Sequence, residues 1–391
     1  MDRRAGSVSL AVLTLVALAT VPALADGGRI KVGDVRPYAA ETPHPYPKTW
    51  TDRVFSPGAE FVRVHFTGLH LGDGDSLTVS SPDGSQVWTY TGRGPHGNGD
   101  VWSFAIDGDT AIVELKGGRG NGWGYRIAEV GHGLVSMSGK KNPPTTEVVC
   151  GTDGREDIAC YPTLVSGAAK PVARLLFTSG GFQYLCTGWL VAGASNSTML
   201  TNNHCMDNQT EVSSLQASFN YQYSACNGST LAGTVNYNGG TFLKTNTEKK
   251  KGNKGGLDYT ILTVNGNPEA TWGELTASST APVVGRQINF IQHPGGNPKD
   301  VGHFEDAAHS TLCAINTINQ TYGFSAAGSQ TGYGCDSEGG SSGSPIVDAT
   351  TGRVIGLHHY GGVTSSPCLN SATMMSKVCA DVGALLSCVA N

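Results

Sequence analysis

The stretch SEGGSSGSPIVD, residues 337–348, decides how the rest of the chain is interpreted. A segment rich in Gly and Ser is ordinarily a flexible linker. Here it leads directly into PIVD and then into GRVIGLHHYGG, whose apolar and β-branched residues are typical of strands. A serine held in such a turn becomes a nucleophile only if a base lies within hydrogen-bond reach. Ser341 and Ser342 are therefore candidate nucleophiles, and the rest of the sequence must supply the base.

The composition favours an all-β protein that does not bind nucleic acid. Charged residues make up only 15% of the 391 residues and there are 54 glycines, so short apolar runs separated by turn residues dominate. Helical periodicity is scarce, and the length is enough for two or three domains. The formal net charge of −5, with no large basic block, argues against nucleic acid as a partner.

The N-terminus has the pattern of a secretory signal peptide. Arg3 and Arg4 precede an apolar stretch at 8–19, and Ala23-Leu24-Ala25 is a small-x-small cleavage pattern. We therefore expect residues 1–25 to be a signal peptide and the protein to be secreted and extracellular. The apolar stretch is short for a membrane anchor and no later segment is long enough, so we expect no membrane association after signal removal.

The cysteines divide the remaining chain into two units. All ten lie at or after residue 150, and an even number in an exported chain indicates disulfides. We expect residues 26–135 to be a β-sandwich without disulfides, residues 136–147 to be a polar linker exposed to processing, and residues 148–391 to be a second, disulfide-stapled domain. The sandwich strands are expected at 61–66, 76–81, 87–92, 101–106, 110–115 and 123–127.

The sequence offers little evidence for a metal site. No cysteine pair has the CxxC spacing of a zinc site. The pairs Asp73/Asp75 and Asp107/Asp109 offer calcium ligands, but Asp next to Gly is ordinary turn chemistry. We expect no metal and no cofactor.

The second unit contains a series of short strand-like runs and one terminal helix. The runs include YLCTGWLVAG, TMLTNNHC, LDYTILTV and RQINFIQH, and the helix is expected at 376–389. About 240 residues of short strands followed by a helix suit two small β-barrels packed together.

Three residues in this unit have the order of an acyl-transfer triad. His204 lies in TNNHC, Asp258 in LDYTIL and Ser342 in GGSSGSPI. The order His, Asp, Ser is one of the known arrangements. His204 can take the serine proton because its unperturbed pKa lies near neutrality, and Asp258 would hold the imidazole in the right tautomer. Each residue alone has a structural explanation, and it is their occurrence together that points to catalysis.

With these motifs, residues 150–389 resemble the trypsin/chymotrypsin family of serine peptidases. The matching pieces are CTGWLV, TNNHC, LDYTIL and GGSSGSPI, and EVVC and VIGLHHYGG are most similar to secreted lysyl-endopeptidase-like and glutamyl-endopeptidase-like members. The resemblance implies a chymotrypsin-like double β-barrel with a C-terminal helix. It also makes Ser342 the nucleophile and places the oxyanion hole at the N–H groups of Gly340 and Ser342.

The sequence departs from the family in two places. Ser341 stands where trypsin-like zymogens carry an Asp that pairs with the new N-terminal amine, so we do not expect activation by N-terminal insertion. Removal of an inhibitory domain is the more natural route. Asn202 and Asn203 precede His204 where small apolar residues are usual, which we expect to change local packing but not the chemistry.

The resemblance also suggests disulfide partners. A bridge between Cys186 and Cys205 would close the loop that presents His204, and the family pattern pairs Cys150 with Cys226. We further expect Cys313 to pair with Cys335 across a hairpin turning near residues 319–320. The other four cysteines are left unassigned.

The substrate pocket is predicted from the family's positions. Ser337, five residues before Ser342, and His358 match the pocket of glutamyl-specific relatives, where they offer hydrogen bonds and, if the ring protonates, positive charge to a carboxylate. Thr373 stands where lysyl-specific relatives have an Asp, so we do not expect lysine specificity. Cleavage after Glu remains open beside cleavage after apolar residues or a broad preference, which would follow if His358 is merely packed in the core.

Two functions of different class are compatible with these patterns. The first is a monomeric secreted serine endopeptidase, made as a precursor, that acts on protein or peptide substrates and loses residues 26–135 as a propeptide. Glu147 and Lys141 are exposed candidates for the processing site. The second is a catalytically silent protease-like domain fused to a carbohydrate- or surface-binding sandwich. Inactive homologues usually lose the Ser or the His, and both are present here.

Overall fold

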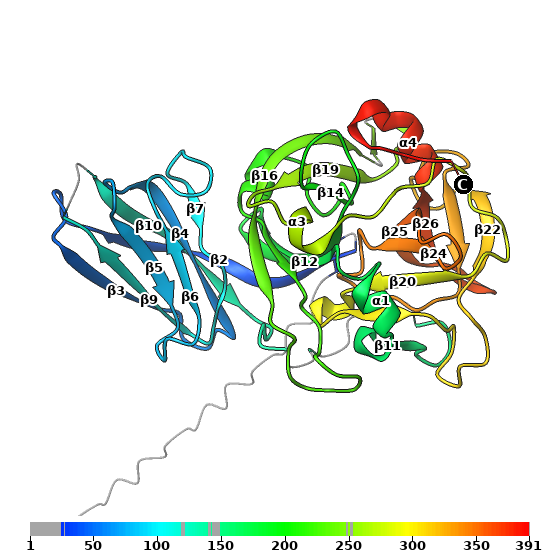
Figure 1. Ribbon diagram of the computed structural model, residues 1–391, viewed down its shortest axis with the longest axis horizontal. Helices are drawn as coiled ribbons and strands as arrows, with labels where there is room; N and C mark the ends of the chain where they lie inside the picture. The colour runs from blue at the N-terminus through cyan, green and yellow to red at the C-terminus, as the bar shows by residue number, and fades with distance from the viewer. Residues whose placement is uncertain are drawn as a thin grey trace, which may run out of the picture.

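The computed structural model describes residues 25–26, 28–118, 122–139, 142, 149–247, 249–250 and 253–390. The expected signal peptide, except Ala25, and most of the expected linker, including Lys141 and Glu147, lie outside the described residues. The protein is mostly β. Two packed sheets at one end form a sandwich, which is followed by a closed barrel, by a further sheet that we call the second sheet, and by a C-terminal helix (Figure 1).

The first part of the chain forms two antiparallel layers that pack face to face (Figure 1). Apolar residues alternate along the strands, and the inward set forms one core that includes Leu77, Val79 and Phe66. One layer contains β2 (Arg29–Glu41), β10 (Gly124–Gly133), β4 (Phe61–His70), β7 (Val101–Trp102) and β8 (Ile106–Asp107). The other contains β3 (Thr49–Phe55), β9 (Thr110–Lys116), β5 (Ser76–Ser80) and β6 (Val87–Tyr90).

Two of these strands were not expected, and one expected strand is broken. β2 and β3 both precede the first predicted run. β2 was not predicted because Pro37 and its scattered charges hide the alternation of apolar and polar residues. The predicted strand at 101–106 is instead two short strands, with Ser103 bonded to the backbone of Val64 between them.

The strand β2 belongs to both halves of the molecule. Its residues 33–41 pair with β10, and its residues 30–34 pair with β13 (Phe182–Leu190) of the barrel. The pairings join the barrel and one layer of the sandwich into a single sheet, and in Figure 1 the blue strand runs from one to the other.

Six strands close into a barrel because β12 pairs with both β13 and β15. The strands are β12 (Val172–Ser179), β13, β14 (Thr198–Thr201), β15 (Gln216–Phe219), β16 (Val235–Asn246) and β19 (Tyr259–Val264). The barrel interior is filled by apolar side chains such as Leu175, Phe177 and Leu262, none of them exposed.

The second sheet follows in the chain and carries the serine-rich turn. Its strands, in spatial order, are β11 (Arg155–Asp157), β21 (Asp300–Gly302), β20 (Ile288–Gln292), β24 (Pro345–Asp348), β25 (Val354–Ser365), β26 (Cys368–Met374), β23 (Gln330–Tyr333) and β22 (Ile315–Gln320). The core between this sheet and the barrel includes Trp189, Tyr259 and Leu357.

The remaining elements are short. Two small pairings involve β1 (Ala25–Asp26) with β2 and β17 (Lys249–Lys250) with β18 (Asn253–Lys254). The helices are α1 (Pro162–Ser166), α2 (Gln209–Ser213), α3 (Glu269–Trp272), α4 (Met375–Val382) and the 3₁₀ turns η1 (Ile158–Cys160), η2 (Pro294–Gly296) and η3 (Gly383–Leu385). The helix expected at 376–389 ends at Val382 because Gly383 takes a positive φ of 58°.

The structure corrects one predicted disulfide. It pairs Cys186 with Cys205 and Cys313 with Cys335, and the second pair lies beside the β22–β23 hairpin. The prediction that Cys150 bonds Cys226 is wrong: Cys150 bonds Cys368, and Cys226 bonds Cys160. The family spacing misled because η1 brings Cys160 close to Cys226, whereas residue 150 lies near the strand β26. The fifth bridge joins Cys379 and Cys388.

Peptide mapping of the unreduced protein tests this connectivity. We expect digestion to release linked peptides that join Cys150 to Cys368 and Cys160 to Cys226. Both should separate on reduction. A linked peptide containing Cys150 and Cys226 would contradict the arrangement of β26 and η1 described above.

Candidate active site

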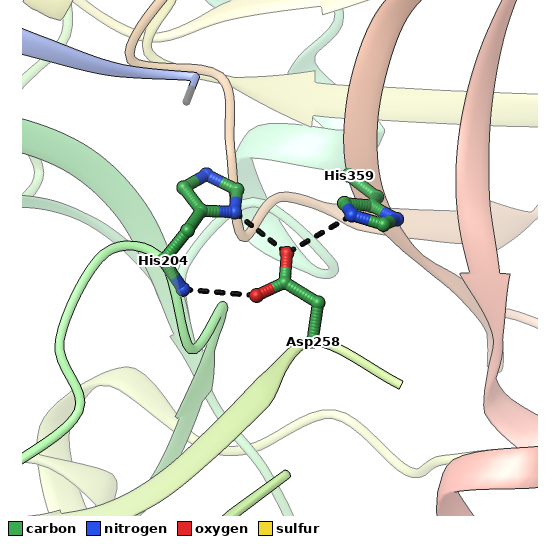
Figure 2. A group of neighbouring side chains, drawn as sticks. All are labelled: His204, Asp258 and His359. Atoms are coloured by element: carbon green, nitrogen blue, oxygen red, sulfur yellow. Dashed lines mark hydrogen bonds and ion pairs between the residues drawn. The ribbon is translucent and has the colours of Figure 1, made fainter. Parts of the chain in front are cut away.

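His204 and Asp258 meet where two paired strands of the barrel end. β14 runs antiparallel to β19, with Thr201 opposite Thr260, so the residues after β14 lie beside those before β19. The backbone N–H of His204 donates to Asp258 Oδ1 at 2.9 Å, and His204 Nδ1 lies 2.6 Å from Asp258 Oδ2 (Figure 2). This contact fixes the ring and leaves Nε2 pointing away from the carboxylate.

The carboxylate of Asp258 is ionised although it is fully buried. Burial raises its pKa, but the nearby His204 and His359 and the hydrogen bonds from His204 outweigh burial and hold the pKa at about 2. At neutral pH the site therefore contains a buried negative charge in direct contact with the His204 ring.

A second histidine contacts the same carboxylate, and the sequence analysis missed it. His359 of β25 places Nε2 3.2 Å from Asp258 Oδ2 (Figure 2). Neighbouring residues of a strand point to opposite faces, so only one of His358 and His359 can face the predicted pocket. That alternation in LHHY was the signal that could have assigned the other histidine to Asp258.

Asn202 has a structural role that the sequence did not reveal. It is fully buried, and its side-chain amide donates to the backbone oxygen of Asp258 at 2.9 Å. The next residue, Asn203, donates to Thr245 Oγ1 at 2.7 Å. Asn202 therefore ties the loop of His204 to the backbone of Asp258, whose φ of 47° is left-handed, and Asn203 ties the same loop to β16.

The turn that carries Ser342 is clamped against the barrel. The backbone N–H of Thr187 in β13 donates to the backbone oxygen of Ser342 at 2.9 Å. The Thr187 hydroxyl donates to the backbone oxygen of Gly340 at 2.8 Å. Gly343 has a φ of 88°, and a Cβ there would lie 2.2 Å from the oxygen of Thr187, so no larger residue fits. The turn therefore holds Ser342 in one position.

Ser342 and His204 face the same point in space. That point is where a Cβ on Gly28 would lie, 2.5 Å from Ser342 Oγ and 2.9 Å from His204 Nε2. Neither Ser342 Oγ nor His204 Nε2 has a hydrogen-bond partner among the described residues. The N–H of Gly340 donates to the oxygen of Gly28 at 3.2 Å, so it is aimed at the same place.

Ser341 is a packing residue in this structure. Its hydroxyl donates to Gln292 Oε1 at 2.6 Å, and it is fully buried. Ser341 stands at the position of the Asp that forms the activating ion pair in trypsin-like zymogens, and here it bonds an amide side chain of β20 instead.

The three residues predicted for the substrate pocket are all fully buried. Ser337 Oγ and His358 Nε2 have no hydrogen-bond partner among the described residues. His358 Nδ1 lies 2.6 Å from the hydroxyl of Tyr333, and Thr373 accepts a hydrogen bond from Gln330 at 2.9 Å.

The charge considered for His358 does not occur at neutral pH. Burial, followed by the neighbouring His359 and His204, lowers its pKa to about 3, so the ring is neutral.

Asp336, six residues before Ser342, is an acidic group that the sequence analysis overlooked. Its two oxygens accept the backbone N–H groups of Cys150 and Gly154 at 2.6 and 2.7 Å. Burial raises its pKa despite these bonds. The carboxylate therefore fastens the segment after the linker to the serine turn.

His204, Asp258 and His359 also have the spacing of metal ligands, with donor atoms within 4.8 Å of one another. The short contact between His204 Nδ1 and Asp258 Oδ2 uses the atoms that a metal would need. We interpret the group as a buried carboxylate that is hydrogen-bonded to His204 and in ion-pair contact with His359.

Among the described residues, no helix is both long and apolar enough to cross a membrane.

Comparison with known proteins identifies the family of this chain. A family model described as lysyl endopeptidase, C-terminal domain, matches residues 152–375. The chain belongs to this family. The matched residues of the peptidase domain include His204, Asp258 and Ser342. A curated relative, Secreted RxLR effector protein 73 of Plasmopara viticola, is 28% identical over 347 residues, which are 83% of this chain and 79% of the relative.

Several solved structures are similar to part of this chain. A Glu endopeptidase in complex with MPD has a TM-score of 0.41 and 21% identity, covering 60% of this chain and 96% of that one. A serine endoprotease from Yersinia pestis has a TM-score of 0.39 and 14% identity, covering 56% of this chain and 63% of that one. By the family that its residues 152–375 match, the chain is a trypsin-like serine protease, and its specificity is left open.

The contact between Asp258 and His204 generates a prediction. Asp258→Asn keeps the size of the side chain but removes the charge and lets His204 take the wrong tautomer. We expect kcat to fall by about 10⁴, as it does for the same change in a well-studied triad. Steady-state kinetics on a peptide substrate measures it.

Asp381→Asn is a suitable control, because Asp381 is a carboxylate of the same protein that bonds Lys244 and Tyr259 and has no contact with His204. Retention of more than about a tenth of the activity by Asp258→Asn would show that the buried charge is not needed.

Proposed function

We propose that this protein is a secreted serine endopeptidase, made as a precursor, in which Ser342, His204 and Asp258 act as one unit. The observation that carries the proposal is the convergence of Ser342 Oγ and His204 Nε2 on one point while His204 Nδ1 bonds the buried, ionised Asp258. The signal-peptide pattern, the disulfides and the name of the curated relative support secretion.

The proposed reaction follows from these atoms. Ser342 Oγ attacks the carbonyl carbon of the peptide bond while its proton passes to His204 Nε2. The N–H groups of Gly340 and Ser342 stabilise the oxyanion. His204 then protonates the leaving amine, which gives an acyl-enzyme, and a water molecule activated by His204 hydrolyses the ester. Asp258 stabilises the charged imidazole in both steps.

The pocket residues favour an acidic or polar side chain before the cleaved bond over a lysine. Ser337 Oγ and His358 Nε2 are buried polar atoms without hydrogen-bond partners among the described residues, which is costly unless a ligand pairs with them. The Tyr333 hydroxyl lies 2.6 Å from His358 Nδ1 and 3.2 Å from the backbone oxygen of Ser371. When its proton is donated to Nδ1, the neutral His358 carries its own proton on Nε2 and can donate it to a carboxylate. Thr373 offers no charge to a buried ammonium, and the carboxylate of Asp336 already accepts two backbone N–H groups. We propose Glu as the preferred residue.

Substitution of the proposed nucleophile and base tests the function. Ser342→Ala and His204→Ala should each lower kcat by about 10⁶, and the double variant should lose little more, because triad members are not additive. Ser344→Ala is a matched control, since Ser344 Oγ lies buried in the same turn without a partner among the described residues. Losses that multiply in the double variant would mean that the two residues do not act together.

A peptide library varied at the residue before the cleaved bond tests the pocket. We expect cleavage after Glu, reduced by at least about tenfold in His358→Ala, the effect of losing a hydrogen bond to a charged group. Efficient cleavage after Lys would overturn the pocket assignment. Cleavage after Glu that is equally fast in His358→Ala would remove that histidine from it.

A further inference from the structure

The N-terminal end of β2 reaches into the candidate active site. The oxygen of Gly28 accepts the N–H of Gly340 at 3.2 Å, which is one of the proposed oxyanion donors. The α-carbon of Gly28 lies so close to Ser342 Oγ and His204 Nε2 that a Cβ would clash with both. In Figure 2 the blue N-terminal strand ends beside His204. A backbone carbonyl of this chain therefore sits where the carbonyl of a substrate would react.

The residues that follow Gly28 pair with the barrel as a bound peptide would. Ile30 lies opposite Leu185 and Lys31 opposite Tyr184, in antiparallel register with β13. β13 continues into Cys186 and Thr187, and Thr187 clamps the serine turn. A strand added along β13 is thereby aimed at Ser342, which is the geometry of recognition by strand addition.

The first side chain after Gly28 lies in a site suited to a cation. The guanidinium carbon of Arg29 lies 4.1 Å from the centre of the Tyr184 ring, and its Nη1 donates to Ser179 Oγ at 3.4 Å. Arg29 is also near enough to Glu211 to lower the pKa of that carboxyl, although burial, the larger effect, raises it. An aromatic face and a carboxylate together select a positive charge.

The second side chain lies in an apolar site. Ile30 is only 2% exposed and packs in a cluster with Leu176 and Leu185 of the peptidase domain and Val32 of its own strand. A Cβ on Gly340 would lie 3.1 Å from Ile30 Cδ1, so this side chain also covers the oxyanion turn. A polar residue at this position would lose that burial.

We propose that the groove along β13 binds the substrate residues that follow the cleaved bond, and that residues 28–32 of this chain fill it in the full-length protein. The proposal rests on the proposed function, because it assigns this groove to the same cleft. The groove takes a cationic residue first and an aliphatic residue second. While residues 28–32 are bound, no substrate can reach Ser342, so the segment inhibits the enzyme in its own chain.

Substitution of Gly28 in the full-length chain tests the occupancy. In Gly28→Ala the new methyl group would overlap Ser342 Oγ and His204 Nε2, so the segment must withdraw. We expect hydrogen exchange of the backbone amides of residues 30–31 and of their partners 184–185 to become at least about tenfold faster. Hydrolysis of a short peptide should rise by a similar factor.

Gly84→Ala is the matched control. Gly84 also has a positive φ, of 72°, but no atom lies within 4 Å of its Cβ position. It should leave both exchange and hydrolysis unchanged. If Gly28→Ala unfolds the chain, exchange will also rise in β9 and β5, and Ile30→Asp then provides a second way to expel the segment.

Equal exchange in Gly28→Ala and Gly84→Ala would overturn the proposed occupancy. Failure of the proposed function would look different, because no variant would then hydrolyse the peptide although the exchange difference remained.

The selectivity of the groove is tested on the Gly28→Ala chain. Peptides of one sequence are compared with Arg or Glu directly after the cleaved bond, and with Ile or Asp at the next position. We expect kcat/KM to be at least about tenfold higher for Arg than for Glu and for Ile than for Asp. Glu211→Gln should reduce the preference for Arg more than the preference for Ile. Equal rates for all four peptides would overturn the selectivity.

Discussion

The buried carboxylate of Asp258 is the constraint on which the candidate site depends. A charge that is fully buried is tolerated only where groups are arranged to stabilise it. Here the His204 backbone and ring, together with His359, supply that stabilisation from two different elements. Asn202 adds a bond to the backbone of the same residue. Because His204 comes from the barrel and His359 from the second sheet, the charge ties the two together at the place where Ser342 is presented.

The strand β13 links the site to the rest of the molecule. Its first residues pair with β2, its whole length pairs with β12 in the barrel, and Thr187 holds the turn of Ser342. The same strand therefore positions Ser342, the proposed nucleophile, and pairs with residues 30–34 of β2. In the proposed mechanism this arrangement would let the sandwich control the site, since β2 extends from the sandwich to Gly28.

The sequence predicted much of the site because catalytic chemistry restricts residue types at fixed spacings. His204, Asp258 and Ser342 were assigned from short motifs, and the all-β fold came from turn residues between apolar runs. The roles of His359 and Asn202 were not predicted, because each depends on the direction in which a single side chain points. The pairing of Cys150 failed for a similar reason, since it depends on the path of the chain between η1 and β26. The approach of Gly28 to Ser342 joins residues more than 300 positions apart, and no local pattern carries such information.

Covalent labelling of the full-length chain with a fluorophosphonate, followed by peptide mapping, tests the central claim most directly. The reaction is irreversible, so a cleft filled by residues 28–32 slows labelling without preventing it. The account predicts a single adduct, on Ser342, that forms far more slowly in His204→Ala. An adduct on another serine, no adduct after long incubation, or equal rates in the two chains would contradict the assignment of Ser342 as a nucleophile activated by His204.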